Sequence, residues 1–539
     1  MKKLKTIYIP LLALLLLAGS CKKNFLNETV YSSYSPATLR DPLGFEASLV
    51  GLYNHFSQFY TRDDRQGWLS VWQVGTDIAY AANPEGVERP YYDYTQLLAT
   101  DAGASYTWSW SYRLINNANI IIKNIEDPSL SGMSDAAKSQ VNAEARFFRA
   151  LGYNTLATCF GDVPLVTSPL DAPKTDFTRT SLTEVNKQIE EDLLFAAANL
   201  PEVGGVGGAN NAAGKPAGRA NRYMAMQLLA TAYLRMDQPA KAEEQTSAIL
   251  NSGKFGLNTT RFGSTSMPGD AFSDLFVYGK MRRSQGNKEV IWVQEMEPNA
   301  SVAGGTQNNP QQRRVWGTGY HNITGMRVAD SLGGRGLGRL RLSNWVVYGL
   351  YEEKDMRNSS HNLRRQFWYN HPNYPNLMGK PVPYVGQDTI ANIGPHTTKW
   401  YHLDPKDTFG YAMIKDIIHM RLGETYLLQA ESQFKQNKPG EAAISINALR
   451  NRAGATPVTA GEITLDLILD ERVRELVGEE NRRMTLMRTK TLVDRAVRLN
   501  SGSPRNPLTG LSSKHLLLPI PLSEIQLNKD AVLNQNPGY

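Results

Sequence analysis

The sequence predicts a mostly α-helical protein in which a long, loop-rich insertion with a little β-structure interrupts the helices. Three observations support this fold class. Apolar residues recur at helical spacing over many stretches. Two regions far apart in the chain each contain a pair of helices joined by a short turn. The segment between these regions is rich in glycine, asparagine and proline, and it has no helical periodicity.

Amphipathic patterns place the helices along the chain. The expected ranges are 42–60, 108–125, 135–158, 181–199, 219–236, 239–250, 421–435, 439–452 and 465–491. The helix at 135–158 should end by Gly161, which tolerates left-handed backbone, and before Pro164, which disfavours helix at the residue preceding it. An apolar run at residues 289–294 favours the one strand expected in the middle segment.

Small residues at regular spacing indicate that the two helix pairs are tetratricopeptide-like. The positions concerned are Ala230, Tyr233 and Ala242 in the first pair and Ala430 and Ala442 in the second. Small side chains let two antiparallel helices approach closely, and stacked pairs bury faces that one pair could not bury. The second pair departs from the motif at Gln433, where an aromatic residue is expected.

The N-terminus has the features of a lipoprotein signal peptide. Three lysines precede an apolar run that is too short to span a bilayer comfortably, and small residues lead to Cys21. This arrangement resembles the bacterial lipobox, in which the cysteine is acylated and becomes the first mature residue. The alternative is an ordinary signal peptide that contains a cysteine by chance. Two or three acyl chains, at about 0.8 kcal/mol per buried methylene, would hold Cys21 on a membrane.

These features suggest five segments. They are a signal peptide (1–20), a lipid-anchored tether (21–40), an N-terminal helical part (41–257), a loop-rich insertion (258–409) and a C-terminal helical part (410–539). An irregular insertion of this length inside a helical chain usually has a function of its own. We therefore expect ligand contacts to come mainly from loops.

Composition excludes several classes of protein. The formal charge of +7 falls to +4 without residues 1–20, which contain three lysines and no acid, so nucleic acid is not an expected partner. The two cysteines are Cys21 and Cys159, and lipidation of the first leaves no intramolecular disulfide. Cys159 lies in an apolar stretch, which predicts a buried thiol. No H-E-x-x-H, phosphate-loop or nucleophile-elbow motif is present, and neither a metal nor a cofactor is implied.

Blocks along almost the whole mature chain occur in an order typical of one family. They are residues 21–27 (CKKNFLN), 144–150 (EARFFRA), 161–166 (GDVPLV), 218–220 (GRA), 421–431 (RLGETYLLQAE), 446–454 (INALRNRAG), 471–476 (ERVREL), 518–521 (LPIP) and 535–539 (QNPGY). Together they resemble the SusD/RagB lipoproteins. The charged side chains of these blocks, such as Arg149 and Arg472, are expected to join helices rather than to bind a ligand.

The resemblance implies a SusD-like fold and a role in nutrient capture without catalysis. Proteins of this family lie on the outer face of the outer membrane and cap a SusC-like TonB-dependent transporter. They hold oligosaccharides or polysaccharides, or in some members peptides, before import. Lys22 and Lys23 depart from the acidic residues that often follow the lipid-bearing cysteine in surface-exposed members. Display on the cell exterior is nevertheless the expected orientation.

Aromatic residues in loops are the candidate ligand platforms, because ring faces offer apolar contact at little entropic cost. The candidates are Tyr91, Tyr92, Tyr94, Trp316, Tyr320 and Trp345, with Asn83 and Asn308 as partners for ligand hydroxyls. Other functions remain open at this point. They are peptide or other nutrient capture, a structural role beside the transporter without any ligand, and a surface glycoside hydrolase, which would need two carboxylates with separate roles.

Overall fold

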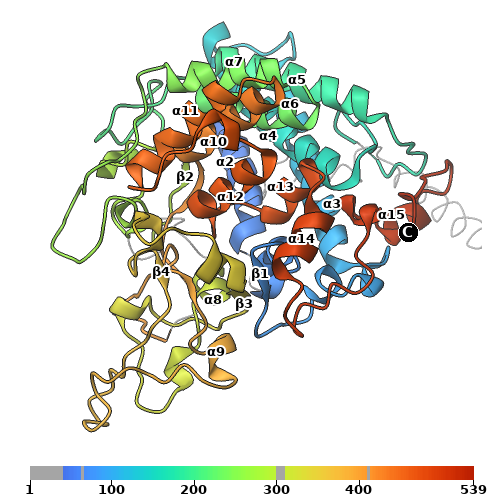
Figure 1. Ribbon diagram of the computed structural model, residues 1–539. Coiled ribbons are helices and arrows are strands. Elements are labelled where there is room, and N and C mark those ends of the chain that lie inside the picture. The colour runs from blue at the N-terminus through green and yellow to red at the C-terminus, as the bar shows by residue number, and fades with distance from the viewer. Residues whose placement is uncertain (1–39, 62–65, 171, 299–309, 410–412) are drawn as a thin grey trace, which may run out of the picture.

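The computed structural model describes residues 40–61, 66–170, 172–298, 310–409 and 413–539 (Figure 1). Cys21, the tether as far as residue 39, and Asn308 lie outside these ranges. The described chain is mostly helical and has three small two-stranded ladders, as predicted. Helices gather in the upper part of Figure 1, whereas short elements and loops project to the lower left.

Four long helices form the N-terminal part of the body. They are α2 (Pro42–Thr61), α3 (Ala102–Ile125), α4 (Asp135–Phe160) and α5 (Leu182–Asn199). The last three begin at side-chain caps, because Asp101, Ser134 and Ser181 each accept a hydrogen bond from a backbone N–H of the first turn. Cys159 of α4 is fully buried, as predicted, and burial raises the pKa of its thiol to about 12.

The two predicted helix pairs are confirmed. They are α6 (Arg222–Arg235) with α7 (Pro239–Leu250), and α10 (Leu422–Lys435) with α11 (Pro439–Arg452). The turn of the first pair contains Asp237 at φ 58° and the turn of the second contains Asn437 at φ 59°. Asp and Asn tolerate this left-handed region better than most residues. The chain therefore makes the same turn twice, two hundred positions apart.

The helices pack in one continuous series. Neighbours in sequence pack from α3 to α7, and α10 then packs against both α7 and α11 (Figure 1). The alanines of the repeat pattern, such as Ala242 and Ala442, are fully buried at these contacts. The second pair thus extends the stack that the first pair began, although more than 170 residues separate α7 from α10.

The predicted helix at 465–491 is wrong in one respect, because the structure divides it. Helix α12 (Leu465–Leu476) ends before Gly478, which has φ 85°, and α13 (Arg482–Arg488) follows. Glycine adopts this backbone without the cost that a Cβ would bring. The last helices are α14 (Leu492–Asn500) and α15 (Leu522–Leu527).

The insertion consists of loops, turns and short elements, as predicted. Its strands and helices are β2 (Val290–Gln294), α8 (Gln312–Trp316), β3 (Leu340–Leu342), a π turn η8 (Trp345–Gly349), β4 (Leu363–Arg364), α9 (Asp388–Ala391) and β5 (His396–Thr397). Strand β2 confirms the predicted strand and pairs with β6 (Ile417–Arg421). Strand β3 pairs with β1 (Ala79–Ala81) from the N-terminal part, and β4 pairs with β5.

Buried ion pairs join the helices, as the sequence blocks predicted. Arg149 of α4 contacts Asp192 of α5 at 2.7 Å, and Arg472 of α12 contacts Glu424 of α10 at 3.0 Å. Glu475 accepts from Arg421 at 2.6 Å. Although burial raises the pKa of Glu475, the surrounding arginines outweigh it and hold the pKa well below its ordinary value. These charges connect helices of the body and are structural.

Candidate functional site

Two of the predicted ligand-binding tyrosines lie in the interior. Tyr91 donates a hydrogen bond to Asp101 Oδ2 at 2.7 Å, and the hydroxyl of Tyr94 accepts one from Arg483 at 2.7 Å. Both rings are at most 2% exposed, so the prediction that they form a ligand platform is wrong. The 3-10 turns η2 (Arg89–Tyr91) and η3 (Tyr94–Gln96) direct these rings inward, where their hydroxyls find buried partners.

The prediction is also wrong for Trp316 and Tyr320. Trp316 is 2% exposed and belongs to the main hydrophobic core. Tyr320 is 1% exposed, and its hydroxyl donates to the carbonyl of Gly334 at 2.9 Å. The neighbouring glycines suggested an open loop, but they instead allow the backbone to fold closely around these two rings.

Three other predicted residues reach the surface. Asn83 is exposed, whereas Tyr92 and Trp345 are half-buried. One face of Trp345 is covered, because the guanidinium of Arg495 lies 5.4 Å from its ring centre. The structure therefore leaves Asn83, Tyr92 and Trp345 available for a ligand, and their role stays a prediction.

A ladder between two distant segments forms the floor of a candidate site. In the β1–β3 pair Tyr80 stands directly opposite Arg341, so both side chains point to the same face of the ladder. The guanidinium carbon of Arg341 lies 5.5 Å from the centre of the Tyr80 ring, a cation–π contact. Both residues are less than a tenth exposed, which fixes the position of the guanidinium.

The hydrogen bonds of Arg341 connect it to the surrounding loops. Its Nη1 donates to Asn344 Oδ1 at 3.1 Å, its Nε donates to the carbonyl of Thr389 at 3.1 Å, and its Nη2 donates to the hydroxyl of Tyr384 at 2.9 Å. The fixed fork of a guanidinium makes such contacts directional. Arg341 therefore sets the orientation of Tyr384, which comes from a proline-flanked loop.

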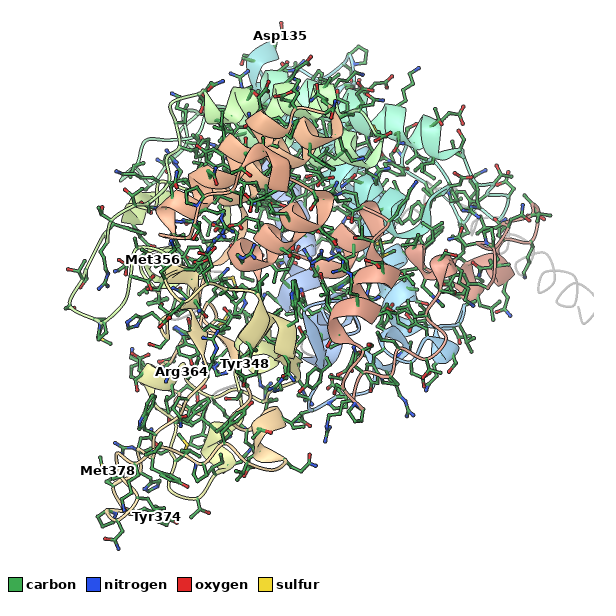
Figure 2. All side chains as sticks on the ribbon, in the orientation of Figure 1. Asp135, Tyr348, Met356, Arg364, Tyr374 and Met378 are labelled. Atoms are coloured by element: carbon green, nitrogen blue, oxygen red, sulfur yellow. The ribbon has the colours of Figure 1, made fainter. Side chains whose placement is uncertain are left out.

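Two tyrosines beside Arg341 present their rings to solvent. Tyr384 is 38% exposed, and Tyr348 of η8 is 60% exposed. Partial burial and the neighbouring Tyr384 hydroxyl raise the pKa of Tyr348, while Arg341 and Arg365 oppose the rise. Tyr348 lies where the insertion meets the helical body, as Figure 2 shows. We call Tyr348, Tyr384, Tyr80 and Arg341 the tyrosine platform.

A pocket of about 370 Å³, lined by charged residues and by prolines, lies near the platform. Arg505 lines this pocket and also donates to Gln387 Oε1 at 3.2 Å, next to α9. Tyr92 is another lining residue, and Asn83 neighbours the pocket at the end of β1. The arrangement offers exposed ring faces beside amides and guanidiniums, the combination that binds polyhydroxylated ligands.

Sequence reasoning missed Tyr348, Tyr384, Arg341 and Arg505. Tyr348 follows the candidate Trp345 by three positions, and Tyr384 lies between Pro383 and Val385 in an exposed loop. These positions in the sequence favour exposure of the two tyrosines but do not show that their rings lie side by side. Arg341 holds Tyr384 in place, and no sequence pattern connects this arginine to either tyrosine.

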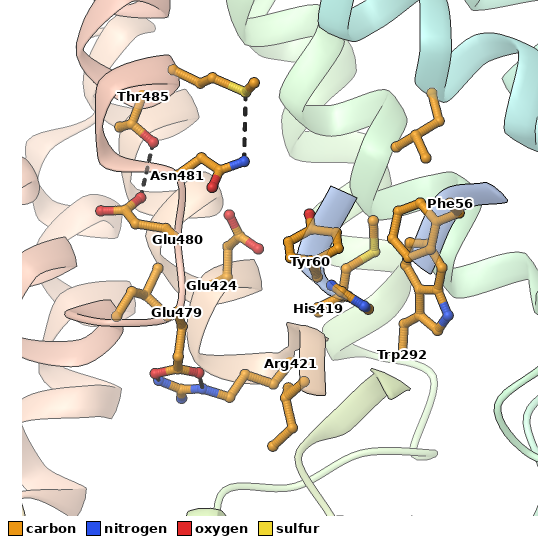
Figure 3. A pocket seen from close by; sticks show the side chains of 15 residues that line it. Phe56, Tyr60, Trp292, His419, Arg421, Glu424, Glu479, Glu480, Asn481 and Thr485 are labelled. Carbon is orange, nitrogen blue, oxygen red and sulfur yellow. Dashed lines mark hydrogen bonds and ion pairs between the residues drawn. The ribbon is translucent and has the colours of Figure 1, made fainter. Parts of the chain in front are cut away.

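A second cavity, of about 200 Å³, lies between the helical parts (Figure 3). Glu479 and Glu480 line it from the turn after α12, not from a helix as predicted. Glu479 accepts from Arg421 at 2.6 Å and Glu480 from Arg472 at 2.7 Å. Although burial raises the pKa of Glu480, Arg472 and its neighbours outweigh it and keep the pKa below its ordinary value.

These pairings bear on the glycoside hydrolase alternative. A hydrolase needs one carboxyl group that stays protonated and one that is ionised. The third acid of the cavity, Glu424, is also paired, with Arg472 at 3.0 Å. The cavity in Figure 3 therefore holds charge-compensated carboxylates that connect helices, and it does not favour acid–base chemistry.

The described residues contain neither a metal-binding cluster nor a membrane-spanning helix. No group of three or more histidine, cysteine, aspartate or glutamate side chains there could hold a metal ion. Among the same residues no helix combines the length and the apolar character needed to cross a bilayer.

Comparison with known proteins identifies the class. Residues 288–539 match the model of the SusD family, and residues 50–234 match a model described as starch-binding associating with outer membrane. These two ranges include both strands of the platform floor. The chain belongs to the SusD family, which confirms the resemblance seen in the sequence.

Individual relatives show the same family over most of their length. The chain is 25% identical to SusD-like protein P25 of Formosa agariphila over 94% of each chain. It is 25% identical to the starch-binding protein SusD of Bacteroides thetaiotaomicron over 76% of this chain and 74% of that protein. Its fold is similar to surface glycan-binding protein A of B. thetaiotaomicron in complex with laminarihexaose, with a TM-score of 0.69, 18% identity and coverage of 92% and 99%.

Proposed function

We propose that this protein is a surface lipoprotein that binds an oligosaccharide or polysaccharide on the tyrosine platform. The observation that supports the proposal most strongly is the exposed pair Tyr348 and Tyr384, because Arg341 holds the hydroxyl of Tyr384 and a pocket lies nearby. Apolar faces of sugar rings stack on such side chains, and neighbouring amides orient the hydroxyls. A relative of the same fold was solved with laminarihexaose, which agrees with this chemistry.

The proposal includes a place and a partner. Cys21 would carry the lipid and keep the protein on the outer membrane, facing the cell exterior. The helical body would then close over a SusC-like TonB-dependent transporter and deliver the glycan to it, without any catalytic step. A tether raises the effective concentration of a partner in the same membrane, so a modest interface would suffice.

Binding to a panel of soluble glycans and peptides, measured by calorimetry, tests the function. Tyr348→Ala and Tyr384→Ala should each weaken glycan binding roughly five- to thirtyfold, the usual cost of removing an aromatic anchor of about 1–2 kcal/mol. Tyr374→Ala is the matched control, because Tyr374 is 39% exposed and lies at the far end of the insertion in Figure 2. Binding of peptides but no glycan would overturn the proposal in favour of peptide capture.

The partner has a separate test. Tagged protein extracted from native membranes in mild detergent should retain a large β-barrel protein. Recovery of the lipoprotein alone, under conditions that keep known membrane complexes intact, would count against the lid role while leaving glycan binding unaffected.

A further inference from the structure

The tyrosine platform is bordered by guanidiniums whose charge is not neutralised. Arg341 belongs to the platform, and Arg365 and Arg505 approach it. Within the described ranges none of the three has a carboxylate at ion-pair distance. Elsewhere in the molecule arginines such as Arg421 and Arg482 are paired with buried acids. A neutral set of acceptors is not unique to this site, because the buried Arg483 also donates only to carbonyls and to the hydroxyl of Tyr94. The candidate site differs in that Arg365 is half-buried and Arg505 is exposed, so that a ligand can reach them.

The three guanidiniums are nevertheless held in place by neutral acceptors. Arg365 donates to the carbonyl of Val347 at 2.7 and 3.0 Å, and Arg505 donates to the carbonyl of Ala82 at 3.2 Å. Arg341 donates to carbonyl, amide and hydroxyl oxygens only. A neutral acceptor satisfies a donor without cancelling its charge, so the platform keeps a local positive potential.

The tyrosines lie inside this field. Burial raises the pKa of Tyr80, and Arg341 and Arg505 oppose the rise. For Tyr348 the arginines that oppose the rise are Arg341 and Arg365. Asp388 is the nearby acid on α9, and it is exposed and accepts a hydrogen bond from Asn392 at 2.7 Å, one turn along. Arg341 and Arg365 thus act on the exposed ring pair, and Arg505 reaches the loop of Tyr384 through its hydrogen bond to Gln387.

The neighbouring pocket has a different balance of positive and negative side chains. Glu85, Asp93 and Arg89 line it together with Arg505. Asp93 is half-buried and accepts from Thr95 at 2.6 Å. The two acids and two arginines of the pocket balance one another, whereas the charged groups that act on Tyr348 are Arg341 and Arg365.

We infer that the platform selects an anionic glycan, one with carboxylate or sulfate groups beside the sugar ring that stacks on Tyr348 and Tyr384. This inference rests on the proposed function and adds the class of ligand to it. A carboxylate or sulfate would form charge-assisted hydrogen bonds with Arg505, the most exposed of the three guanidiniums, while the ring faces hold the sugar. Neutral glycans would keep the stacking contacts and lose the ionic ones.

Matched ligands that differ only in charge provide the test. The probes are laminarihexaose and its sulfated derivative, and hexagalacturonate and its methyl ester. Calorimetry at low salt should show each anionic ligand binding at least tenfold more tightly than its neutral counterpart, and an increase in salt should reduce this advantage. A preference for the carboxylate pair alone or the sulfate pair alone would identify which anion is recognised, and either supports the inference.

Variants of Arg505 separate the contribution of its charge from that of stacking on the two tyrosines. Arg505→Gln should lower affinity for the anionic ligand about tenfold and leave the neutral ligand unchanged, and Arg505→Lys should recover part of the loss. Lys187→Gln, at an exposed position of α5, removes the same charge far from the site and should have no effect. Equal binding of charged and neutral glycans, with Arg505→Gln unchanged, would overturn the anionic selectivity and leave glycan binding intact. Failure of every glycan to bind would overturn both.

Discussion

The carboxylate of Asp77 accepts two hydrogen bonds from the guanidinium of Arg482, from Nε at 2.9 Å and from Nη2 at 2.6 Å, although 405 positions separate the two residues in the chain. Arg495 donates to the same carboxylate at 2.8 Å, and all three side chains are fully buried. Although burial raises the pKa of Asp77, the two arginines outweigh it and hold the pKa below its ordinary value. The N-terminal part and the last helices are thus joined by one ionic cluster.

Asp77→Asn should destabilise the protein by about 1–3 kcal/mol, because the buried guanidiniums of Arg482 and Arg495 lose the carboxylate that they share and keep only their other acids, Glu480 for Arg482 and Asp466 with Asp470 for Arg495. Chemical denaturation followed by circular dichroism measures the change in the free energy of unfolding. Asp494→Asn on α14 is the control, since that side chain is 68% exposed and should change stability by less than about 0.5 kcal/mol. Equal stability of both variants would contradict the structural role of the cluster.

Protonation of His396 should make the protein less stable in acid. The ring is 2% exposed, and burial lowers its pKa to about 4, below the ordinary value of 6.5. The unfolded chain binds this proton more readily, so stability falls as the pH decreases from about 6.5 to about 4. The loss between pH 7 and 5 is about 2 kcal/mol for this group.

His396→Gln removes the titrating group, so the variant no longer loses stability in acid through position 396. The difference in unfolding free energy between wild type and variant should therefore shrink as the pH falls from 7 to 5. A difference that stays constant over this interval would show that His396 does not titrate as its burial implies.

Because Asn437 lies in a left-handed turn, the stability of the protein should depend strongly on the residue type at this position. Asn437→Val should cost about 1–2 kcal/mol, because a β-branched residue is strained at φ 59°. Asn437→Gly should remain within about 0.5 kcal/mol of the wild type. Thermal unfolding of the two variants measures the effect, and the same pair of substitutions at Asp237 should rank in the same order.

Membrane attachment is expected to depend on Cys21. Cys21→Ser should move the protein from the membrane fraction to the soluble fraction, because the acyl chains supply the binding energy. Fractionation of cells followed by immunodetection measures this. Protease treatment of intact cells that express the unchanged protein tests the orientation, and cleavage is the expected result although Lys22 and Lys23 follow Cys21. Resistance to the protease would indicate a periplasmic position.

The sequence predicted the helical frame well, for physical reasons. Long helices such as α4 bury a continuous apolar stripe and begin at a capping residue, Ser134, so their pattern is local. The break between α12 and α13 was missed although Gly478 marks it, because the apolar spacing continues through the turn. Helix pairs were visible because their small residues recur at a fixed interval.

The site was harder to predict because exposure is a property of the folded chain. Tyr91 and Tyr348 both lie in irregular segments, yet the first is fully buried and the second is 60% exposed. What separates them is a tertiary partner, Asp101 for the hydroxyl of Tyr91. Likewise, Tyr80 and Arg341 are paired only through the β1–β3 ladder, whose strands are too short to give a sequence signal.

The β2–β6 ladder has a consequence for how the family can change its ligands. Gln294 and Ile417, the residues at which the intervening segment leaves and re-enters the body, are partners in that ladder. The ends of the segment are therefore already adjacent, and changing its length alters loop entropy only slightly. The segment is nevertheless tied to the helices, because its Arg357 pairs with Glu471 and Glu475 of α12 at 2.7 and 3.1 Å, and all three side chains are fully buried. A graft that carries a new specificity onto the same frame should therefore keep Arg357 as well as β3, the strand that places Arg341 opposite Tyr80.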